Sequence, residues 1–210
     1  MRTWLLAAAE RREFDGILRR CGASQRLTWP EAQFAREVEW RGDRWILIAN
    51  GPGPRLVERA LGNKIEVDAI ISTGLCGALD PTLRVGDIVR GGPDVVFSTD
   101  RVAATAAEKR ALFERTGARA VEMESAAVRA KAAEWGVKYD CIRAVSDTAE
   151  EDMPLDFNRY RDADGRFSRT RIALAAMAHP FTVMPRLTRL DRNCRLAADA
   201  LGEFFATSQF

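Results

Sequence analysis

The sequence predicts one α/β domain in which helices flank a largely parallel or mixed central β-sheet. Short, continuous apolar runs alternate along the chain with stretches in which apolar residues recur at helical spacing. The first pattern is typical of strands covered on both faces, and its alternation with helices favours a parallel sheet. A length of 210 residues and an apolar share of 47% suit one domain with a hydrophobic core. Because no internal repeat, low-complexity tract or linker divides the sequence, we expect this single domain to span residues 1–210.

The first third of the chain is expected to form a strand, a helix, a hairpin, a helix and a strand. The opening apolar run is too short to cross a membrane and stops at charged residues, so it is predicted to be a buried strand and not a targeting segment. The hairpin is predicted from two strand-like runs joined by a tight turn, with Gly42 and Asp43 as turn residues. The expected ranges are a strand over 4–9, a helix over 10–20, hairpin strands over 34–40 and 45–49, a helix after Gly51–Pro54, and a strand over 67–72.

The remaining two thirds continue the alternation of strands and helices. The strand over 119–122 is notable because it runs directly into a helix with no turn residues between them. The expected elements are apolar segments over 86–89 and 94–97, a polar helix around 106–115, a strand over 119–122, a helix over 125–135, a strand over 139–146, a loop over 154–165, and helices over 167–178 and 187–205.

Composition excludes several classes of function. The 32 basic and 30 acidic side chains leave a net charge of +2, without the basic excess that nucleic-acid binding usually needs, so we expect no nucleic-acid partner. The single histidine, His179, excludes a multi-histidine metal site, and no spacing suggests a metal or an organic cofactor. The four cysteines are far apart and form no CxxC pair, so we expect reduced thiols in a cytoplasmic protein.

Polar residues follow the ends of four predicted strands, where ligands gather in open α/β sheets. They lie in segments 10–13, 73–77, 122–124 and 143–147. Three of these segments have ordinary structural explanations: acidic residues at a helix start, glycines in a tight turn, and a helix cap. Segment 122–124 is different, because an acidic side chain at the buried end of a strand usually has a ligand or a partner. Arg143 is the natural countercharge, either in a structural Arg–Glu pair or with both charges facing a pocket.

Three motifs, in order, resemble the nucleoside phosphorylase/nucleosidase superfamily. Residues 121–127 (VEMESAA) and 143–149 (RAVSDTA) are similar to its two signature segments, and residues 71–89 (ISTGLCGALDPTLRVGDIV) to its glycine-rich segment. The resemblance is strongest to methylthioadenosine/adenosylhomocysteine nucleosidases. The C-terminal part, with Met153-Pro154-Leu155 and Asp164-Gly165, resembles the branch of hopanoid-associated phosphorylases more loosely. The resemblance implies a nucleoside phosphorylase-like fold and cleavage of the N-glycosidic bond of a purine nucleoside.

The resemblance also implies roles for individual residues. Asp147 matches the general acid that protonates N7 of the purine, and Ser146 would orient it. Glu124 matches the carboxylate that binds the ribose hydroxyls, a contact that strengthens as positive charge builds on the sugar. Met123 would pack beneath the ribose, and the backbone of Val102 would meet the base.

The nucleophile decides between hydrolysis and phosphorolysis. Residues 8–14 (AAERREF) resemble the segment whose glutamate activates water in the nucleosidases. Spacing favours Glu13 as that glutamate, with Glu10 as the alternative. This resemblance favours water as the nucleophile.

Phosphorolysis needs a phosphate pocket, typically an arginine and a serine near the glycine-rich turn. The turn residues are Thr73, Gly74 and Gly77. Ser72 and Leu75 occupy the matching positions, so the phosphate signature is missing, and Leu75 also replaces a small polar residue of some nucleosidases. Arg143, with backbone N–H groups, remains a candidate anion site for a phosphorylase. A third alternative is a non-catalytic protein that binds a purine nucleoside.

Two further features bear on substrate and partners. The stretch from Gly91 to Arg119 is shorter than in the family, so the base and 5′ pockets are expected to be open, filled by a neighbouring subunit, or degenerate. Family members often complete the pocket across a subunit interface, and the resemblance therefore implies a homo-oligomer.

The C-terminal segment, about residues 159–210, is predicted to be helical and basic. Nine arginines and three aspartates give residues 159–195 a local charge of +6. The simpler interpretation is two amphipathic helices that pack on the sheet with solvated arginines outward. The alternative is a basic, apolar face that contacts an anionic membrane surface and gives access to a lipid-linked nucleoside.

Overall fold

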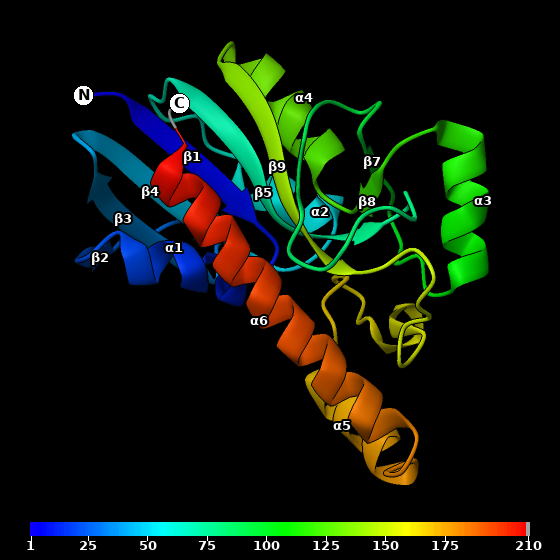
Figure 1. The fold of residues 1–210 in the computed structure, drawn as a ribbon. Coiled ribbons are helices and arrows are strands. Elements are labelled where there is room, and N and C mark those ends of the chain that lie inside the picture. Colours follow the sequence, from blue (N-terminus) through cyan, green and yellow to red (C-terminus); the bar gives the residue numbers. More distant parts are fainter. Residues whose placement is uncertain (209–210) are drawn as a thin grey trace.

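A nine-stranded mixed β-sheet forms the centre of the computed structural model, which describes residues 1–208 (Figure 1). Strands β1, β4, β5 and β9 run parallel to their neighbours in the centre, while β2, β3, β6 and β8 each make antiparallel pairs. The strands are β1 Thr3–Ala8, β2 Ser24–Arg26, β3 Phe34–Trp40, β4 Asp43–Ala49, β5 Ala69–Ala78, β6 Ile88–Arg90, β7 Val96–Ser98, β8 Ala120–Glu122 and β9 Lys138–Asp147.

The strand order brings together the segments that sequence motifs singled out. The main path is β2-β3-β4-β1-β5-β8-β7, with β9 paired to both β5 and β6. β5 therefore has β1, β8 and β9 as neighbours. Segment 10–13 follows β1, segment 122–124 begins at the last residue of β8, and segment 143–147 forms the end of β9. This arrangement confirms the predicted α/β fold class with a mixed central sheet.

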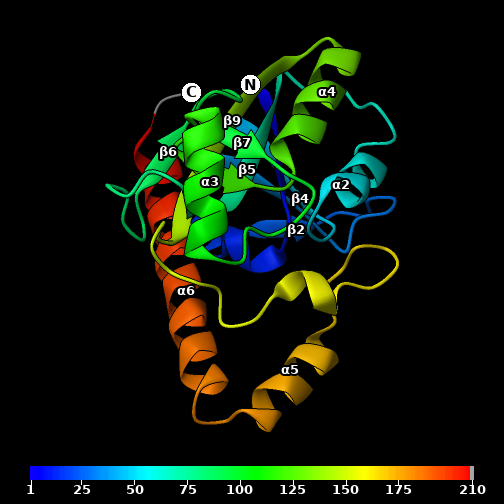
Figure 2. The ribbon, with the colours of Figure 1, turned by 90° about the vertical axis from the view of Figure 1, so that its right-hand side faces the viewer.

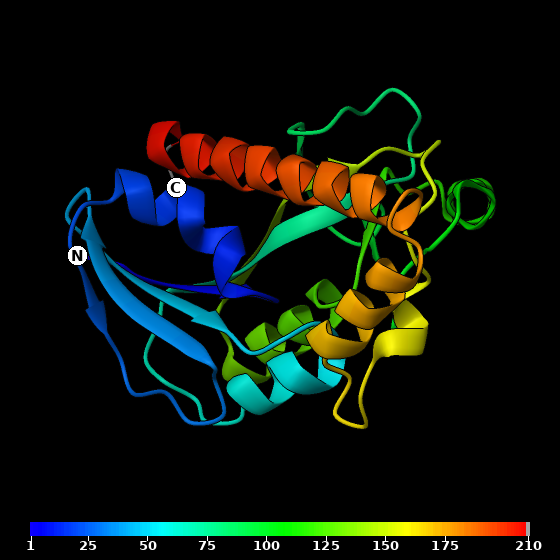
Figure 3. The same ribbon diagram turned by 90° about the horizontal axis from the view of Figure 1, so that it is seen from below.

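Helices cover both faces of the sheet. Helices α1 and α6 pack on one face, and α2 and α4 pack on the other (Figure 3). The helices are η1 Arg11–Phe14 and η2 Phe157–Tyr160, both 3-10, with α1 Asp15–Arg20, α2 Pro54–Ala60, α3 Ala106–Thr116, α4 Ser125–Trp135, α5 Arg169–Ala178 and α6 Val183–Thr207.

The alternating side chains of β1 explain why the sheet is covered on both faces. Leu6 and Ala8 join the core beneath α1 and α6, while Leu5 and Ala7 join the core beneath α2 and α4. All four are buried. A continuous apolar run thus serves two cores, as the period of two along a strand requires.

The glycine-rich segment corrects one prediction. The strand was expected over 67–72 with a turn at Thr73, Gly74 and Gly77, but β5 continues through these residues to Ala78. Its parallel pairing with β9 continues to Gly77, with a register shift between Cys76 and Gly77, and Gly77 and Ala78 also pair with β8. Because Thr73, Gly74 and Gly77 all pair with β9, these residues do not form a turn.

The hairpin also differs in detail from the prediction. Its central turn residues are Arg41 and Gly42, which have φ values of 52° and 77°. Both residues have positive φ, as in the turns that suit the twist of two-residue hairpins. Asp43 instead pairs with Trp40 in the ladder, and its carboxylate accepts hydrogen bonds from the Arg2 backbone N–H at 2.8 Å and from Trp4 Nε1 at 3.1 Å.

The C-terminal helices form a hairpin that projects beyond the sheet (Figures 1 and 2). The second half of α6 packs against α1 and the sheet, while α5 and the first half of α6 extend away from them. None of the helices within residues 1–208 combines the length and apolar character of a transmembrane span. The predicted basic segment also includes residues 209–210, which lie outside the described residues.

The projecting hairpin only partly fits the predicted pattern of solvated arginines and buried apolar residues. Arg186 donates to the backbone oxygens of Asp152 and Met153, and Arg189 pairs with Glu151. The exposed apolar side chains are Leu174, Met177, Phe181 and Met184. Two arginines are thus anchored to the body of the protein, while Leu174 and Met177 of α5 are exposed.

Two glycines set the distance between α1 and α6. A Cβ on Gly16 would lie 2.0 Å from the carbonyl oxygen of Ala198, and a Cβ on Gly202 would lie 2.2 Å from the carbonyl carbon of Gly16. The colliding atoms belong to the backbone, so no flexible side chain can move away. The helices can approach this closely only with glycine at both positions.

We predict that Gly202→Ala lowers the free energy of unfolding by about 3 kcal/mol, because a methyl group must push two packed helices apart. Urea unfolding followed by circular dichroism measures the change. Gly92→Ala is the matched control, since a Cβ at Gly92 meets nothing within 4 Å. Equal midpoints for the two variants would show that the helices separate without loss of stability.

Candidate active site

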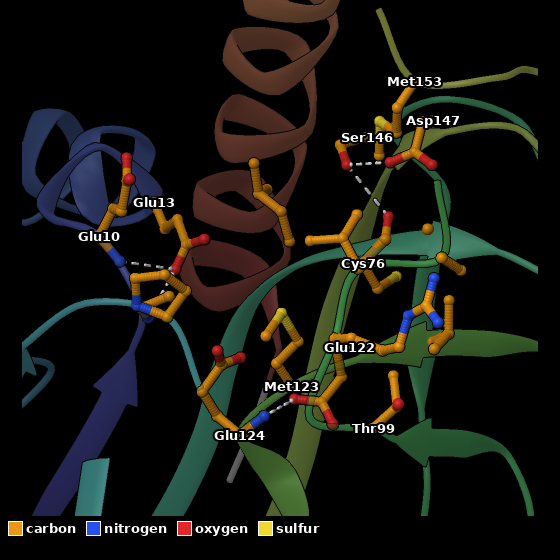
Figure 4. A pocket seen from close by; sticks show the side chains of 18 of the residues that line it. Glu10, Glu13, Cys76, Thr99, Glu122, Met123, Glu124, Ser146, Asp147 and Met153 are labelled. Carbon is orange, nitrogen blue, oxygen red and sulfur yellow. Dashed lines mark hydrogen bonds between the residues drawn. The ribbon is translucent and has the colours of Figure 1, made fainter. Parts of the chain in front are cut away.

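A pocket opens where β1, β5, β8 and β9 present their ends or edges to α3 and to the loop that follows β9 (Figure 4). It contains most of the predicted site residues. Its wall consists of Ala9, Glu10, Arg12, Glu13, Pro52, Leu75, Cys76, Gly77, Thr99, Arg101, Val102, Ala103, Lys109, Val121, Glu122, Met123, Glu124, Ser146, Asp147, Met153 and Phe167. The predicted residues Thr73, Gly74 and Arg143 lie behind this wall.

Glu13 occupies one side of the pocket, in the 3-10 helix that follows β1. It is buried, and its carboxylate accepts hydrogen bonds from the backbone N–H groups of Ala9 at 2.9 Å and Glu10 at 3.3 Å. Burial raises the pKa of Glu13 to about 7, because desolvation outweighs the opposing charge of Arg143. A carboxyl group with this pKa exchanges protons near neutral pH, as a general base must.

Gly74 makes room for Glu13. It has a φ of 126°, and a Cβ at this position would lie 2.5 Å from Glu13 Oε2 and 3.1 Å from Arg143 Nη1. The missing side chain therefore leaves a space that both a carboxylate and a guanidinium border. Gly74, which the sequence motif contained, thus allows Glu13 and Arg143 to approach the same space.

Glu124 and Met123 line the pocket from the segment between β8 and α4 (Figure 4). Glu124 Oε1 accepts a hydrogen bond from the backbone N–H of Gly53 at 2.7 Å. Burial and the nearby charge of Glu122 raise the pKa of Glu124 above its ordinary value, although Arg143 acts in the opposite direction. Met123 is buried beside it and lines the pocket.

Arg143 lies beneath the pocket, where it is completely buried. Its Nη2 donates to Ser72 Oγ at 2.7 Å and to Glu122 Oε2 at 2.5 Å, and its Nη1 lies 3.5 Å from Glu124 Oε2. Glu122 also accepts from the backbone N–H groups of Glu124 and Ser125. The main countercharge of Arg143 is therefore Glu122, a residue that the sequence motif contained but to which we assigned no role.

Asp147 ends β9 on the side of the pocket away from Glu13. Its Oδ1 accepts from Ser146 Oγ at 2.7 Å, and Ser146 Oγ also lies 3.2 Å from the carbonyl oxygen of Cys76. A Cβ on Gly77 would lie 2.9 Å from Asp147 Oδ2, so this glycine gives the carboxylate space against β5. The structure thus brings Ser146, Asp147 and Gly77 together, as the motifs suggested.

Lys109 is a pocket residue that the sequence analysis did not identify. It comes from α3, is completely buried, and its Nζ contacts Asp147 Oδ2 at 2.5 Å. No motif marks it, because α3 is a polar helix with little apolar periodicity. Only the packing of α3 against the loop after β9 reveals the contact.

The backbone of Val102 forms two hydrogen bonds with the side chain of Asn158. Its N–H donates to Asn158 Oδ1 and its carbonyl oxygen accepts from Asn158 Nδ2, both at 2.9 Å. Val102 lines the pocket, and the contact of its backbone with a base stays a prediction. Asn158 lies 56 residues away in the chain, in η2, so this pairing depends on the fold of the loop after β9.

The described residues contain no group of three or more His, Cys, Asp and Glu side chains that could hold a metal ion. The charged side chains that line the pocket are four glutamates, Asp147, Lys109 and two arginines. Arg12 lies 3.0 Å from Glu10, and Arg101 lies 2.7 Å from Glu108.

Comparisons with known proteins give a match to one family model over part of the chain. Residues 93–178 match the family model described as the phosphorylase superfamily. None of the curated proteins matches the chain.

Solved structures with the same fold span nearly the whole chain. A variant of the 5′-methylthioadenosine nucleosidase of Helicobacter pylori, with 5′-methylthioadenosine in its active site, has a TM-score of 0.72 and 15% identity, covering 98% of this chain and 96% of that one. The 5′-methylthioadenosine/S-adenosylhomocysteine nucleosidase of Neisseria meningitidis, in complex with methylthio-immucillin-A, has a TM-score of 0.70 and 19% identity, covering 98% and 97%. The futalosine hydrolase of Helicobacter pylori has a TM-score of 0.70 and 15% identity, covering 97% and 95%.

At these identities the structural matches establish the fold, and the family model adds a sequence pattern within it. The chain therefore has the fold of these nucleosidases and of futalosine hydrolase, and its residues 93–178 match the model of the phosphorylase superfamily.

Proposed function

We propose that this protein is a nucleosidase that hydrolyses the N-glycosidic bond of a purine nucleoside. The observation that carries the proposal is that Glu13, Glu124 and Asp147 border one pocket from three different strand ends. Cleavage through an oxocarbenium-like transition state needs a proton for the base, a negative group near the sugar and a positioned nucleophile. The nucleoside-like ligands of two proteins with the same fold support this substrate class.

Each acidic group has a role that follows from its surroundings. Asp147, held by Ser146 and Lys109, faces the pocket as the group that gives a proton to the leaving base. Glu124 lies on the opposite side, where it binds the ribose hydroxyls above Met123. Negative charge near the sugar stabilises the transition state more than the ground state, which is the requirement for catalysis.

Glu13 and Arg143 supply a place for the nucleophilic water. Both groups approach the space above Gly74, which lacks a side chain. Among the described residues, the buried Nε and Nη1 of Arg143 have no hydrogen-bond partner, so Nη1 can donate to a water oxygen. Glu13 can accept the proton of that water as it attacks the anomeric carbon.

Electrostatics favour water over phosphate as the nucleophile. Arg143 is the guanidinium that borders the space at Gly74, and it already pairs with Glu122 at 2.5 Å and faces Glu124 at 3.5 Å. A phosphate at Gly74 would also meet the carboxylate of Glu13, so three carboxyl groups would lie near the bound anion. A neutral water molecule avoids this repulsion.

We predict that Asp147→Asn and Glu124→Gln each lower the rate of glycosidic cleavage by at least about 10²-fold, the usual effect of losing one acid or electrostatic group. Release of free base from a panel of purine nucleosides measures the rate. If the wild-type protein binds these nucleosides and releases no base, the protein is a non-catalytic nucleoside-binding protein and not an enzyme. Near-normal turnover by either variant would remove that residue from the mechanism.

We predict that Glu13→Gln abolishes turnover while nucleoside binding survives, and that Glu10→Gln, the matched control, has little effect. Because only deprotonated Glu13 can act as a base, the wild-type rate should rise with pH through about 7. The raised pKa also means that ionisation of Glu13 destabilises the fold as the pH rises through 7, so Glu13→Gln should melt above the wild type at pH 8.5. A strict need for phosphate, with ribose 1-phosphate as product, would instead identify a phosphorylase.

We also propose that the α5–α6 hairpin contacts an anionic membrane surface. The substrate would then be a lipid-linked purine nucleoside in that membrane. Phe181 is 93% exposed, and Leu174 and Met177 are each 61% exposed. Residues 166–190 contain five arginines and no acidic residue, so the charge around these apolar side chains complements anionic lipid. The cytoplasmic location and the homo-oligomer expected from the sequence stay predictions.

We predict that the protein co-sediments with phosphatidylglycerol-containing vesicles at low salt and less at high salt. The double variant Leu174→Ser and Phe181→Ser should lower binding by at least about tenfold, because each apolar side chain contributes more than 1 kcal/mol when buried. Leu196→Ser is the control, since Leu196 is also exposed but lies on the part of α6 near the sheet. An unchanged vesicle affinity together with a changed oligomeric state would assign the face to a second copy of the chain.

A further inference from the structure

Lys109 is a buried cation with three hydrogen-bond partners. Its Nζ donates to Asp147 Oδ2 at 2.5 Å, to the carbonyl oxygen of Thr148 at 2.7 Å and to the carbonyl oxygen of Glu151 at 3.0 Å. An ammonium group has three N–H donors, so each donor has one acceptor. The geometry thus fits the charged form of Lys109 beside an ionised Asp147.

Core packing does not explain a lysine at this position. Within α3, all of which the structure describes, Lys109 is the one buried side chain. Burying an ion pair costs several kcal/mol of desolvation, and a well-packed apolar pair would stabilise a helix at least as well. The lysine also lines the pocket beside Asp147, so its placement relates to the chemistry of that residue.

The pair raises a question about the proposed general acid. An Asp147 that is ionised in the resting protein carries no proton for a leaving base. The nearest transferable proton is then on Nζ of Lys109, which touches Asp147 Oδ2 directly. Oδ2 is also the oxygen closest to Gly77, a residue of the pocket wall, so one atom borders both the lysine and the pocket.

We propose that Lys109 is a positioning residue that supplies, through Asp147, the proton for the leaving base. This inference rests on the proposed nucleosidase function. An Nζ–H bond of Lys109 breaks as an O–H bond forms on Asp147 Oδ2, and the new hydroxyl turns about the Cγ–Oδ2 bond to face the pocket. That O–H bond breaks as an N–H bond forms on the base, which keeps the electron pair of the glycosidic bond. Lys109, now a neutral amine, regains a proton from solvent after the base leaves.

The test compares a substrate whose leaving group needs a proton with one whose leaving group does not. Adenosine is the first, and 4-nitrophenyl β-D-ribofuranoside, which releases a stable phenolate, is the second. Lys109→Met should lower kcat for adenosine by at least about 10²-fold and leave kcat for the nitrophenyl riboside within about threefold of the wild type. Lys109→Arg keeps the charge but cannot release a proton, so it should show the same pattern.

Three further measurements complete the design. Arg110→Met changes the next, exposed residue of α3 and should leave both rates unchanged. Because Lys109 acts through Asp147, the variant with both Lys109→Met and Asp147→Asn should be no slower on adenosine than Asp147→Asn alone. Melting temperatures identify any variant that fails to fold, and Lys109→Arg then replaces Lys109→Met in the comparison.

The outcomes separate this inference from the proposed function. If the wild-type protein cleaves neither substrate, the nucleosidase function is wrong and the inference falls with it. If the wild type cleaves both, equal losses of kcat on the two substrates in Lys109→Met would show that Lys109 has a structural role only. Full activity of Lys109→Arg on adenosine would show that Lys109 acts through its positive charge and not by giving a proton. Either result overturns the proton-supply role.

Discussion

The buried guanidinium of Arg143 is the constraint on which the rest of the site depends. It sits in β9 with no exposed surface, and three acidic side chains from two other chain segments gather around it. One of them, Glu122, pairs with it closely and also bonds the start of α4. Glu13 and Glu124 are buried near the same guanidinium. Desolvation by burial raises the pKa values of both groups and outweighs the opposing charge of Arg143, so the site gains groups that exchange protons near neutral pH.

Two glycines of β5 allow this charge cluster to exist within a packed sheet. Gly74 leaves the space into which Glu13 projects, and Gly77 leaves the space beside Asp147. A side chain at either position would collide with a carboxylate oxygen that other bonds hold in place, from the backbone N–H groups near Glu13 and from Lys109 near Asp147. β5 therefore pairs in parallel with its neighbours in the core and also leaves the space that the carboxylates of Glu13 and Asp147 occupy.

The parts of the chain outside the sheet complete the site by covering it. Helix α3 contributes Lys109, and the loop after β9 returns to the pocket with Met153 and Phe167. Asn158 in that loop binds the backbone of Val102, and Arg186 of α6 holds the loop at Asp152 and Met153. The C-terminal hairpin is thereby connected to the pocket through a short series of polar contacts. Met153 both lines the pocket and accepts a hydrogen bond from Arg186 of the hairpin through its backbone oxygen.

The order and type of most of the strands and helices could be predicted from the sequence, because apolar periodicity is a local property. Glu13, Glu124 and Asp147 were assigned from short motifs that resemble the family, because such motifs are contiguous in the chain. The tertiary structure decided the contacts between distant segments: Glu122 as the partner of Arg143, Asn158 at Val102, the strand conformation of Thr73, Gly74 and Gly77, and the pairing of Lys109 with Asp147 across 38 residues. These contacts arise from how the strands pair and how α3 packs, and a polar helix without a clear apolar stripe carries no local signal for its own position.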